Sequence, residues 1–272
     1  MKFLFRLILP IVSLLSITES CTVQDHLKPA IDPYINCLLS QKKDMDLTPL
    51  EAGSNLTVGD DFPNGNGTAK IVDIINIDGQ NYAISSSGEN IDTYQYDSNK
   101  KIITHTHSNR FIRGAETYSY EYAPNKLTEK FVHEGWPSET RTYSYDLNEY
   151  GLIPKMGVTY NDEGYTINDH GSKITILNGN AIKSEYLSAT SFAEFDLTKS
   201  NIPNPLPFFG KTDHNLIQKN TIDYGGYYPY KLIVEYRYQF DNEGKVTRLI
   251  TISRYYDGHK NIAARSYKYG CN

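Results

Sequence analysis

The fold is decided by the stretch YRYQFDNEGKV, residues 236–246. Side chains alternate between the two faces of a strand, so the three aromatic residues share one face and the polar residues between them point the other way. Asp241 then begins a turn by bonding its own backbone, and Gly244 supplies the positive φ that a tight turn requires. Val246 opens the return strand. The stretch therefore predicts a β-hairpin with one packed and one wetted face.

The same unit recurs from residue 69 to the end of the chain. Further Tyr-x-Tyr or Tyr-Tyr pairs, most of them followed by a turn rich in Asp, Asn or Gly, begin at Tyr94, Tyr118, Tyr143, Tyr255 and Tyr267. The 272 residues include 23 Tyr against 10 Phe and 1 Trp, a composition that favours half-buried strands. Helix-length segments with a 3.6-residue period do not separate the copies. We predict an all-β fold, an antiparallel meander of hairpins that forms a large curved sheet or a closed soluble barrel.

The start of the chain is typical of an export signal. A short basic stretch precedes the apolar run at residues 7–15, which is too short to span a bilayer. The run leads to Ser20 and Cys21, which resemble a bacterial lipoprotein signal in which the cysteine is lipidated after cleavage. We predict lipidation at Cys21 and an exported chain at the bacterial outer membrane or cell surface. The alternatives are ordinary secretion, with cleavage near the same place, and a core helix over residues 3–17.

Three regions follow from these patterns. We expect a signal peptide at 1–20, a lipidated tether and irregular N-terminal segment at 21–68, and a repetitive antiparallel β domain at 69–272. The middle region lacks clear periodicity and is rich in turn residues at 56–67. It offers one weak helical pattern, at about residues 34–42.

The mature chain would hold three cysteines. If Cys21 carries lipid, Cys37 and Cys271 remain as a pair, and exported proteins lie where disulfides persist. A Cys37–Cys271 bond would fasten the N-terminal segment to the last strand. The alternative is two free thiols.

The repeated units carry two resemblances. The Tyr-x-Tyr-Asp-x-x-Gly-x-aliphatic unit resembles the tyrosine-aspartate repeat of large bacterial cell-surface proteins. The lipoprotein-like start, the repeats and the Pro/Asn-rich stretch at 201–211 before the last hairpins resemble an uncharacterised family of Bacteroidetes lipoproteins with a porin-like fold. That resemblance covers about residues 70–272 and implies fold and location, with no known activity.

Two histidines and several acidic turns are the candidate metal sites of the sequence. His105 and His107 are two residues apart, so a strand would place both on one face, where they could bind a metal together with His133. The alternative, which we favour, is an ordinary wetted strand face. The Asp-Asn-Glu-Gly turns lack the ligand spacing of a calcium loop and are explained by turn chemistry. We predict neither a metal nor any other cofactor.

Two aromatic loops are the candidate binding sites. One contains Tyr224, Tyr227, Tyr228 and Tyr230, whose rings could stack on sugars or anchor a protein partner. The other contains Phe208 and Phe209. In the alternative interpretation the tyrosines cover the rim of the sheet and the phenylalanines plug its end, and for the phenylalanines we favour this alternative.

Charge and motifs narrow the function. The net charge is −5 and Lys and Arg are scattered, so nucleic-acid binding is not expected. The sequence has no Gly-x-Ser-x-Gly, His-Glu-x-x-His or phosphate-binding loop. We therefore predict a non-catalytic cell-envelope lipoprotein that binds a glycan or a cell-surface protein, or that has a structural place there. The alternative is a hydrolase acting on polysaccharide.

Overall fold

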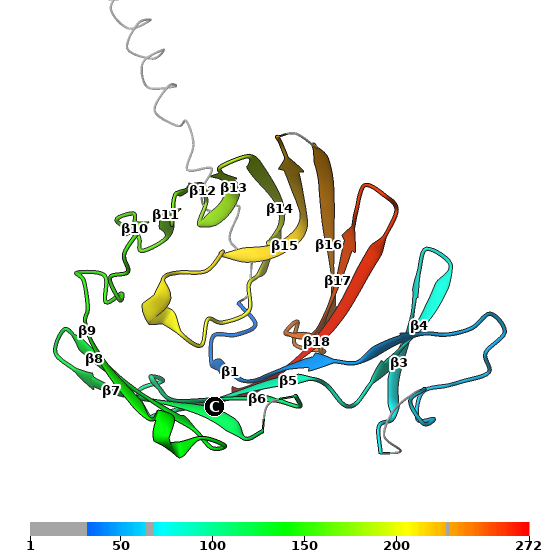
Figure 1. Ribbon diagram of the computed structural model, residues 1–272, viewed down its shortest axis with the longest axis horizontal. Helices are drawn as coiled ribbons and strands as arrows, with labels where there is room; N and C mark the ends of the chain where they lie inside the picture. The colour runs from blue at the N-terminus through cyan, green and yellow to red at the C-terminus, as the bar shows by residue number, and fades with distance from the viewer. Residues whose placement is uncertain (1–31, 64–67, 112, 227–228, 272) are drawn as a thin grey trace, which may run out of the picture.

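The computed structural model describes residues 32–63, 68–111, 113–226 and 229–271, and it is nearly all β (Figure 1). The predicted signal peptide, Cys21, Tyr227 and Tyr228 lie outside these ranges. Over the ranges that are described, no helix is long and apolar enough to cross a membrane. The fold class predicted from the repeats is confirmed.

The strands form two antiparallel sheets, one of fifteen strands and one of three. The strands of the large sheet are β1 (Cys37–Met45), β5 (Asn90–Tyr96), β6 (Ile102–Asn109), β7 (Ala115–Ala123), β8 (Lys126–His133), β9 (Arg141–Asp146), β10 (Val158–Tyr160), β11 (Thr166–Asp169), β12 (Ser172–Leu177), β13 (Asn180–Tyr186), β14 (Ala189–Ser200), β15 (Asn215–Tyr224), β16 (Tyr230–Phe240), β17 (Val246–Arg254) and β18 (Lys260–Cys271). The small sheet contains β2 (Leu47–Pro49), β3 (Ile71–Ile77) and β4 (Gln80–Ser85).

Most strands of the large sheet pair with their neighbours in sequence, as a meander does. The exception is β1, which lies between β18 and β5 and joins the two halves of the sheet. We expected residues 21–68 to be irregular, with at most a helix near 34–42. Instead, Tyr34 lies in a turn and residues 37–45 form a strand. Pairing on both sides of β1 outweighs the weak local preference for helix.

The large sheet curves strongly but does not close. Its two edges are β9 and β10, so the observed form is the open curved sheet and not the closed barrel (Figure 1). The rings of the Tyr-x-Tyr units line the concave side, where Tyr94, Tyr120 and Tyr267 are core residues. The connection between β14 and β15 folds into this concave side and supplies Phe208 to the same core.

The small sheet lies against the convex side of β17 and β18 (Figure 1). Its Ile77 and Ile84 are fully buried against Ile250, Ile252 and Ala264 of the large sheet. The alternation of side chains explains this arrangement, because Ile250 and Ile252 of β17 point outward to the small sheet while Leu249 between them packs inward. Residues 71–85, which the repeats placed in one continuous sheet, therefore form a separate layer.

The turns confirm the chemistry predicted from the sequence. The side chain of Asp241 accepts hydrogen bonds from the backbone N–H groups of Glu243 and Lys245, both at 2.9 Å, and Gly244 has φ 87°. Equivalent carboxylate or amide oxygens begin the turns at Asp97, Asn148 and Asn161. Each of these residues satisfies two backbone donors, which is how an Asx turn reverses the chain.

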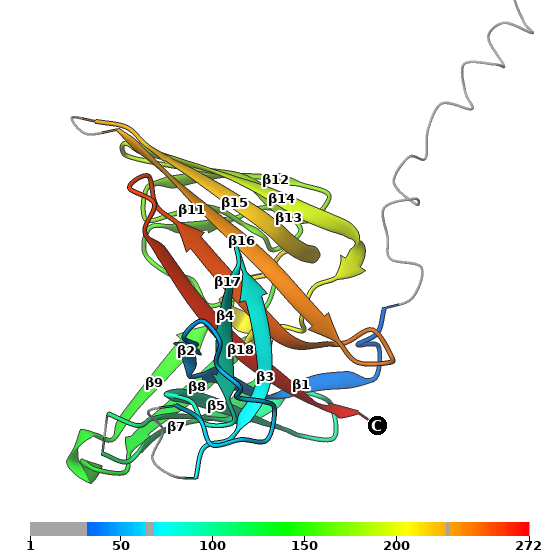
Figure 2. The same ribbon diagram turned by 90° about the vertical axis from the view of Figure 1, so that its right-hand side faces the viewer.

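Antiparallel pairing places the turns alternately at two ends of the large sheet. We call the end with Cys37 and Cys271 the disulfide end, and it also holds the Asx turns at Asp97 and Asp241. We call the opposite end the far end, and it holds the connections β6–β7, β8–β9, β13–β14, β15–β16 and β17–β18. Figure 2 shows the β17–β18 turn at the left and the C-terminus at the right, so the two ends are well separated.

Candidate functional site

Exposed apolar side chains gather at the far end. Five large residues there are between 52% and 95% exposed, and we call them the far-end set. They are Phe111, Trp136, Met156, Leu187 and Tyr256. Each residue lies in a turn or directly before a strand. These segments follow one another around the curve of the sheet and are not adjacent in sequence. Their position at one end makes this end the candidate binding surface.

The predicted tyrosine loop lies at this same end. Tyr224 and Tyr230 are opposite one another where β15 and β16 meet, and their rings stack with centroids 4.3 Å apart. Tyr256 of the far-end set lies 5.5 Å from Tyr230, which extends the row of rings to the next hairpin. The sequence therefore located one part of an aromatic surface.

Sequence reasoning missed the rest of the far-end set. Trp136 and Phe111 lie in turns that also contain glycine, and Met156 directly precedes Gly157. The signal that could have found them is a single large apolar residue beside a turn glycine. Such residues cannot pack within their own hairpin, so they either reach a neighbouring element or meet solvent.

Trp136 is held in place by His133. The Nδ1 atom of His133 accepts hydrogen bonds from the backbone N–H groups of Gly135 at 3.0 Å and Trp136 at 3.2 Å. The two rings stack with centroids 4.4 Å apart. His133 ends β8 and shapes the turn that follows it. Its Nδ1 atom is already used by these two hydrogen bonds, so this atom is not free to bind a metal.

The two phenylalanines occupy the concave core rather than a binding surface. Phe208 is buried, with its ring centroid 5.1 Å from that of Tyr120 and 4.8 Å from that of Phe209. Phe209 is partly buried against the same core, with Lys155 over its ring at 4.1 Å. Both phenylalanines therefore fill the interior of the sheet, in line with the packing role that we favoured for them over ligand binding.

His105 and His107 converge on a carboxylate. The Nε2 atom of His105 and the Nδ1 atom of His107 each lie 2.9 Å from Oδ1 of Asp92, and Nζ of Lys42 lies 2.9 Å from Oδ2. An ionised carboxylate only accepts, so both facing imidazole nitrogens carry hydrogen. Within the part of the chain that the structure describes, no three His, Cys, Asp or Glu side chains are arranged to hold a metal ion. The pair thus belongs to a buried charge network.

This network stiffens the concave face beside the core. The ring of His105 is stacked between Tyr94 at 4.9 Å and Tyr118 at 5.3 Å. Burial alone would raise the pKa of Asp92, but hydrogen bonds from His105, Lys42 and His107 outweigh it and hold that pKa well below the ordinary value. Asp92 therefore stabilises the folded protein in its ionised form.

The network predicts a defined loss of stability in acid. Because the folded pKa of Asp92 is depressed, its contribution is complete above the ordinary aspartate pKa near 4 and is lost as the pH falls below it. The free energy of unfolding should fall by up to about 1.4 kcal/mol per pH unit from this group. Asp92→Asn should be less stable than wild type at pH 6, and the gap should narrow toward pH 2.5. Urea unfolding at each pH measures it, and a gap independent of pH would contradict it.

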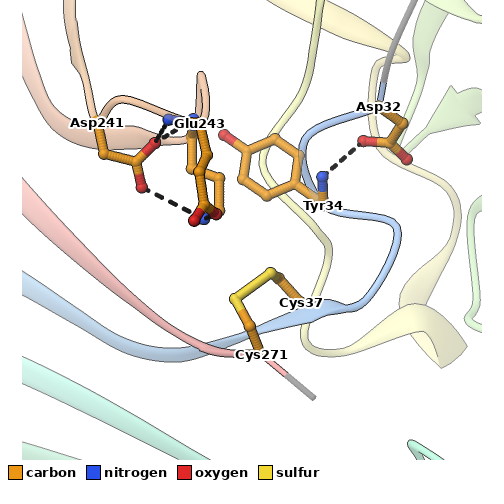
Figure 3. The surroundings of a disulfide bond; sticks show 7 residues. Asp32, Tyr34, Cys37, Asp241, Glu243 and Cys271 are labelled. Atoms are coloured by element: carbon orange, nitrogen blue, oxygen red, sulfur yellow. Dashed lines mark hydrogen bonds and ion pairs between the residues drawn. A yellow bond between two sulfur atoms is a disulfide. The ribbon is translucent and has the colours of Figure 1, made fainter.

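Cys37 and Cys271 are joined by a disulfide at the disulfide end (Figure 3). Nearby, the backbone N–H of Tyr34 donates to Asp32 at 3.0 Å, and the Tyr34 hydroxyl accepts a hydrogen bond from the backbone N–H of Val246 at 2.9 Å. These contacts fasten the first described residues to the end of the large sheet. The predicted lipidation site, Cys21, lies outside the described residues.

Two cavities accompany these features. The larger, about 970 Å³, lies where β1 and β5 separate at the far end, and its lining includes Arg110 and Phe111. The smaller, about 430 Å³, lies at the disulfide end between residues 32–38 and the β14–β15 connection. Both fall in the size range of ligand pockets. The larger one adjoins the far-end set.

Comparison with known proteins adds a fold-level likeness. A solved structure, described as a porin-like protein from Bacteroides uniformis ATCC 8492, is similar over 85% of this chain and 98% of its own. The TM-score is 0.48 and the sequence identity is 15%, so the likeness carries no conclusion about function. No family model and no curated protein matches the chain. The resemblance to the tyrosine-aspartate repeat and to the lipoprotein family remains a prediction.

Proposed function

We propose that this protein is a lipoprotein of the bacterial cell envelope that binds a polysaccharide without catalysing a reaction. The observation that carries the proposal is the far-end set, five large exposed side chains collected at one end of the curved sheet. Export is supported by the signal-like residues 1–20 and by the disulfide, since such bonds persist in oxidising compartments.

The position of the N-terminal segment supports the far end as the binding end. Asp32, the first described residue, lies at the disulfide end beside Tyr34. Cys21 precedes it by eleven residues, which span at most about 40 Å when fully extended. The twelve residues of β18 are themselves about 40 Å long. A lipid on Cys21 would hold the disulfide end toward the membrane and leave the far end directed outward.

A polysaccharide fits the far end better than a protein surface does. The exposed rings are divided among separate turns, and polar residues of the same end, such as Asp169 at the end of β11 and the turn residues His170 and Asp257, accompany them. Separate rings offer stacking faces for successive sugar units, while carboxylates and imidazoles can exchange hydrogen bonds with hydroxyl groups. A protein partner would favour one continuous apolar patch with a buried centre.

The proposal predicts loss of binding when two far-end rings are removed. The full chain with Cys21→Ser would be exported without lipid, and its appearance in the soluble fraction tests the anchor. This protein should bind one or more bacterial or host polysaccharides on an array. Adding Trp136→Ala and Tyr256→Ala should weaken binding at least tenfold, or about 1.4 kcal/mol, because both rings are exposed and contribute contact rather than core packing.

The matched control is Tyr150→Ala, which removes a partly exposed ring at the disulfide end and should leave binding unchanged. Equal binding by the double variant and the control would contradict the far end as the site. Release of reducing ends from a bound polysaccharide would instead favour the hydrolase alternative. Thermal unfolding of every variant verifies that the fold is retained.

A further inference from the structure

The larger cavity forms where the wall of the curved sheet divides. β1 pairs with β5 only from Gln41 to Lys43, whereas its pairing with β18 continues to Met45. Beyond that point the end of β1 and residues 262–265 of β18 form one side of the cavity, and residues 87–89 with Arg110 and Phe111 form another. The rest of the lining comes from residues 46–48, 62–63 and 68–69, which belong to the small sheet and its connections. The cavity of about 970 Å³ is large enough for a small ligand.

The two sides of the cavity meet at Gly88. A Cβ atom added to Gly88 would lie 1.6 Å from the backbone oxygen of Asp44, so only glycine permits this approach. The contact fixes the distance between the end of β1 and the 87–89 segment. The cavity is therefore bounded by a tight backbone contact on which its shape depends.

Charged groups of both signs converge on this cavity. The guanidinium of Arg110 contacts Asp46 at 2.9 Å and Glu89 at 2.6 Å. Arg265 contacts Asp44 at 2.7 Å. The lining thus pairs three carboxylates with two guanidinium groups, and the side chain of Arg110 is still 48% exposed. Donors and acceptors are held side by side, and solvent reaches them.

The mixture of carboxylates and guanidinium groups in the lining favours an uncharged ligand. An anion would meet three carboxylates and a cation would meet two guanidinium groups, so either would be opposed by part of the lining. A neutral molecule with adjacent hydroxyls can donate to a carboxylate and accept from a guanidinium at the same time. Phe111, strongly exposed, stands beside this wall with its ring 4.9 Å from the Arg110 guanidinium carbon. The face of the ring opposite Arg110 can cover the C–H side of a sugar ring.

We propose that this cavity binds one or two neutral sugar units, held by the Arg110 cluster and stacked on Phe111. The inference rests on the proposed polysaccharide-binding function and assigns it a specific pocket. The other two rings of the far-end set, Trp136 and Tyr256, would then contact the continuing chain of the polysaccharide. The terminal or internal sugar in the cavity would provide selectivity, because its hydroxyls must match fixed donors and acceptors.

The test uses the full chain carrying Cys21→Ser, with maltose, cellobiose and N,N′-diacetylchitobiose as probes in calorimetric titrations and ligand-observed NMR. We expect at least one of these neutral disaccharides to bind. Phe111→Ala and Arg110→Met should each weaken that binding at least tenfold. The controls, Phe192→Ala and Arg237→Met, replace an exposed ring and an equally exposed guanidinium away from the cavity and should leave the affinity unchanged.

Three outcomes would overturn the pocket. They are no binding of any disaccharide, equal affinity in Phe111→Ala and wild type, and tighter binding of glucose 1-phosphate than of the neutral sugars. The double variant Trp136→Ala with Tyr256→Ala separates an error in the pocket from an error in the proposed polysaccharide-binding function. If these far-end changes abolish polysaccharide binding while disaccharides never bind, the pocket alone is wrong. If disaccharides bind through Phe111 but no polysaccharide does, the far-end proposal alone is wrong.

Discussion

Replacing Phe208 with alanine is expected to lower the free energy of unfolding by about 3–5 kcal/mol. The ring is 4% exposed and fills the concave core between Tyr120, Phe209 and the aliphatic residues around them. Its removal would lose the burial of the ring and leave a cavity that the curved sheet cannot close. Because the ring belongs to the connection between β14 and β15, the variant also tests whether this connection is a structural plug.

The matched control is Phe192→Ala, which removes a ring of the same size that is 45% exposed on β14. We expect it to cost less than about 1 kcal/mol. Urea unfolding followed by tyrosine fluorescence measures both changes, and the dependence on urea should stay similar if both unfold the same surface. Equal losses in the two variants would mean that the connection contributes no more than a surface ring.

The periodic parts of the fold could be predicted because local chemistry determines them. Tyr238 and Tyr267 lie on the concave face as the alternation requires, and Asp241 forms its turn with the expected backbone bonds. One ring of the deciding stretch departs from the pattern. Phe240, at the end of β16, is 39% exposed, and the register between β16 and β17 also shifts between Gln239 and Phe240. A bulge of this kind is set by the partner strand and leaves no local mark.

The long-range parts could not be predicted. The position of β1 between β18 and β5 depends on pairing over more than 200 residues, and its own sequence has no strong strand pattern. The separation of β2, β3 and β4 into their own layer depends on the match between Ile77 and Ile84 and the outer face of β17. Whether the sheet would close was also open, because closure depends on curvature summed over fifteen strands.

Only those candidate residues that lie close together in the sequence could be identified from it. Tyr224 and Tyr230 were found because they flank one recognisable loop. The far-end set was missed because its members come from separate turns that only the antiparallel order brings to one end. His105 and His107 were found as a pair, but their partner Asp92 lies on the preceding strand and can be identified only from the register.

Loss of the Cys37–Cys271 bond is expected to destabilise the protein by about 3–5 kcal/mol. The two cysteines are 234 residues apart, so the bond restricts nearly the whole described chain in its unfolded state. The loop-entropy model gives about 5 kcal/mol for a loop of this length, near the upper limit of measured values. The bond also secures the start of β1, the strand that connects the two halves of the large sheet.

The double variant Cys37→Ala with Cys271→Ala measures this effect in urea, beside wild type with and without reductant. Wild type in reductant should unfold near the midpoint of the variant, and reductant should leave the variant unchanged. Tyr34 remains as a second fastening, through the bond from Val246 and the contact with the Tyr269 ring at 5.2 Å. We therefore expect the variant to fold. If its midpoint equals that of oxidised wild type, pairing by β18 and β5 alone holds β1, and the bond adds nothing to the stability of the sheet.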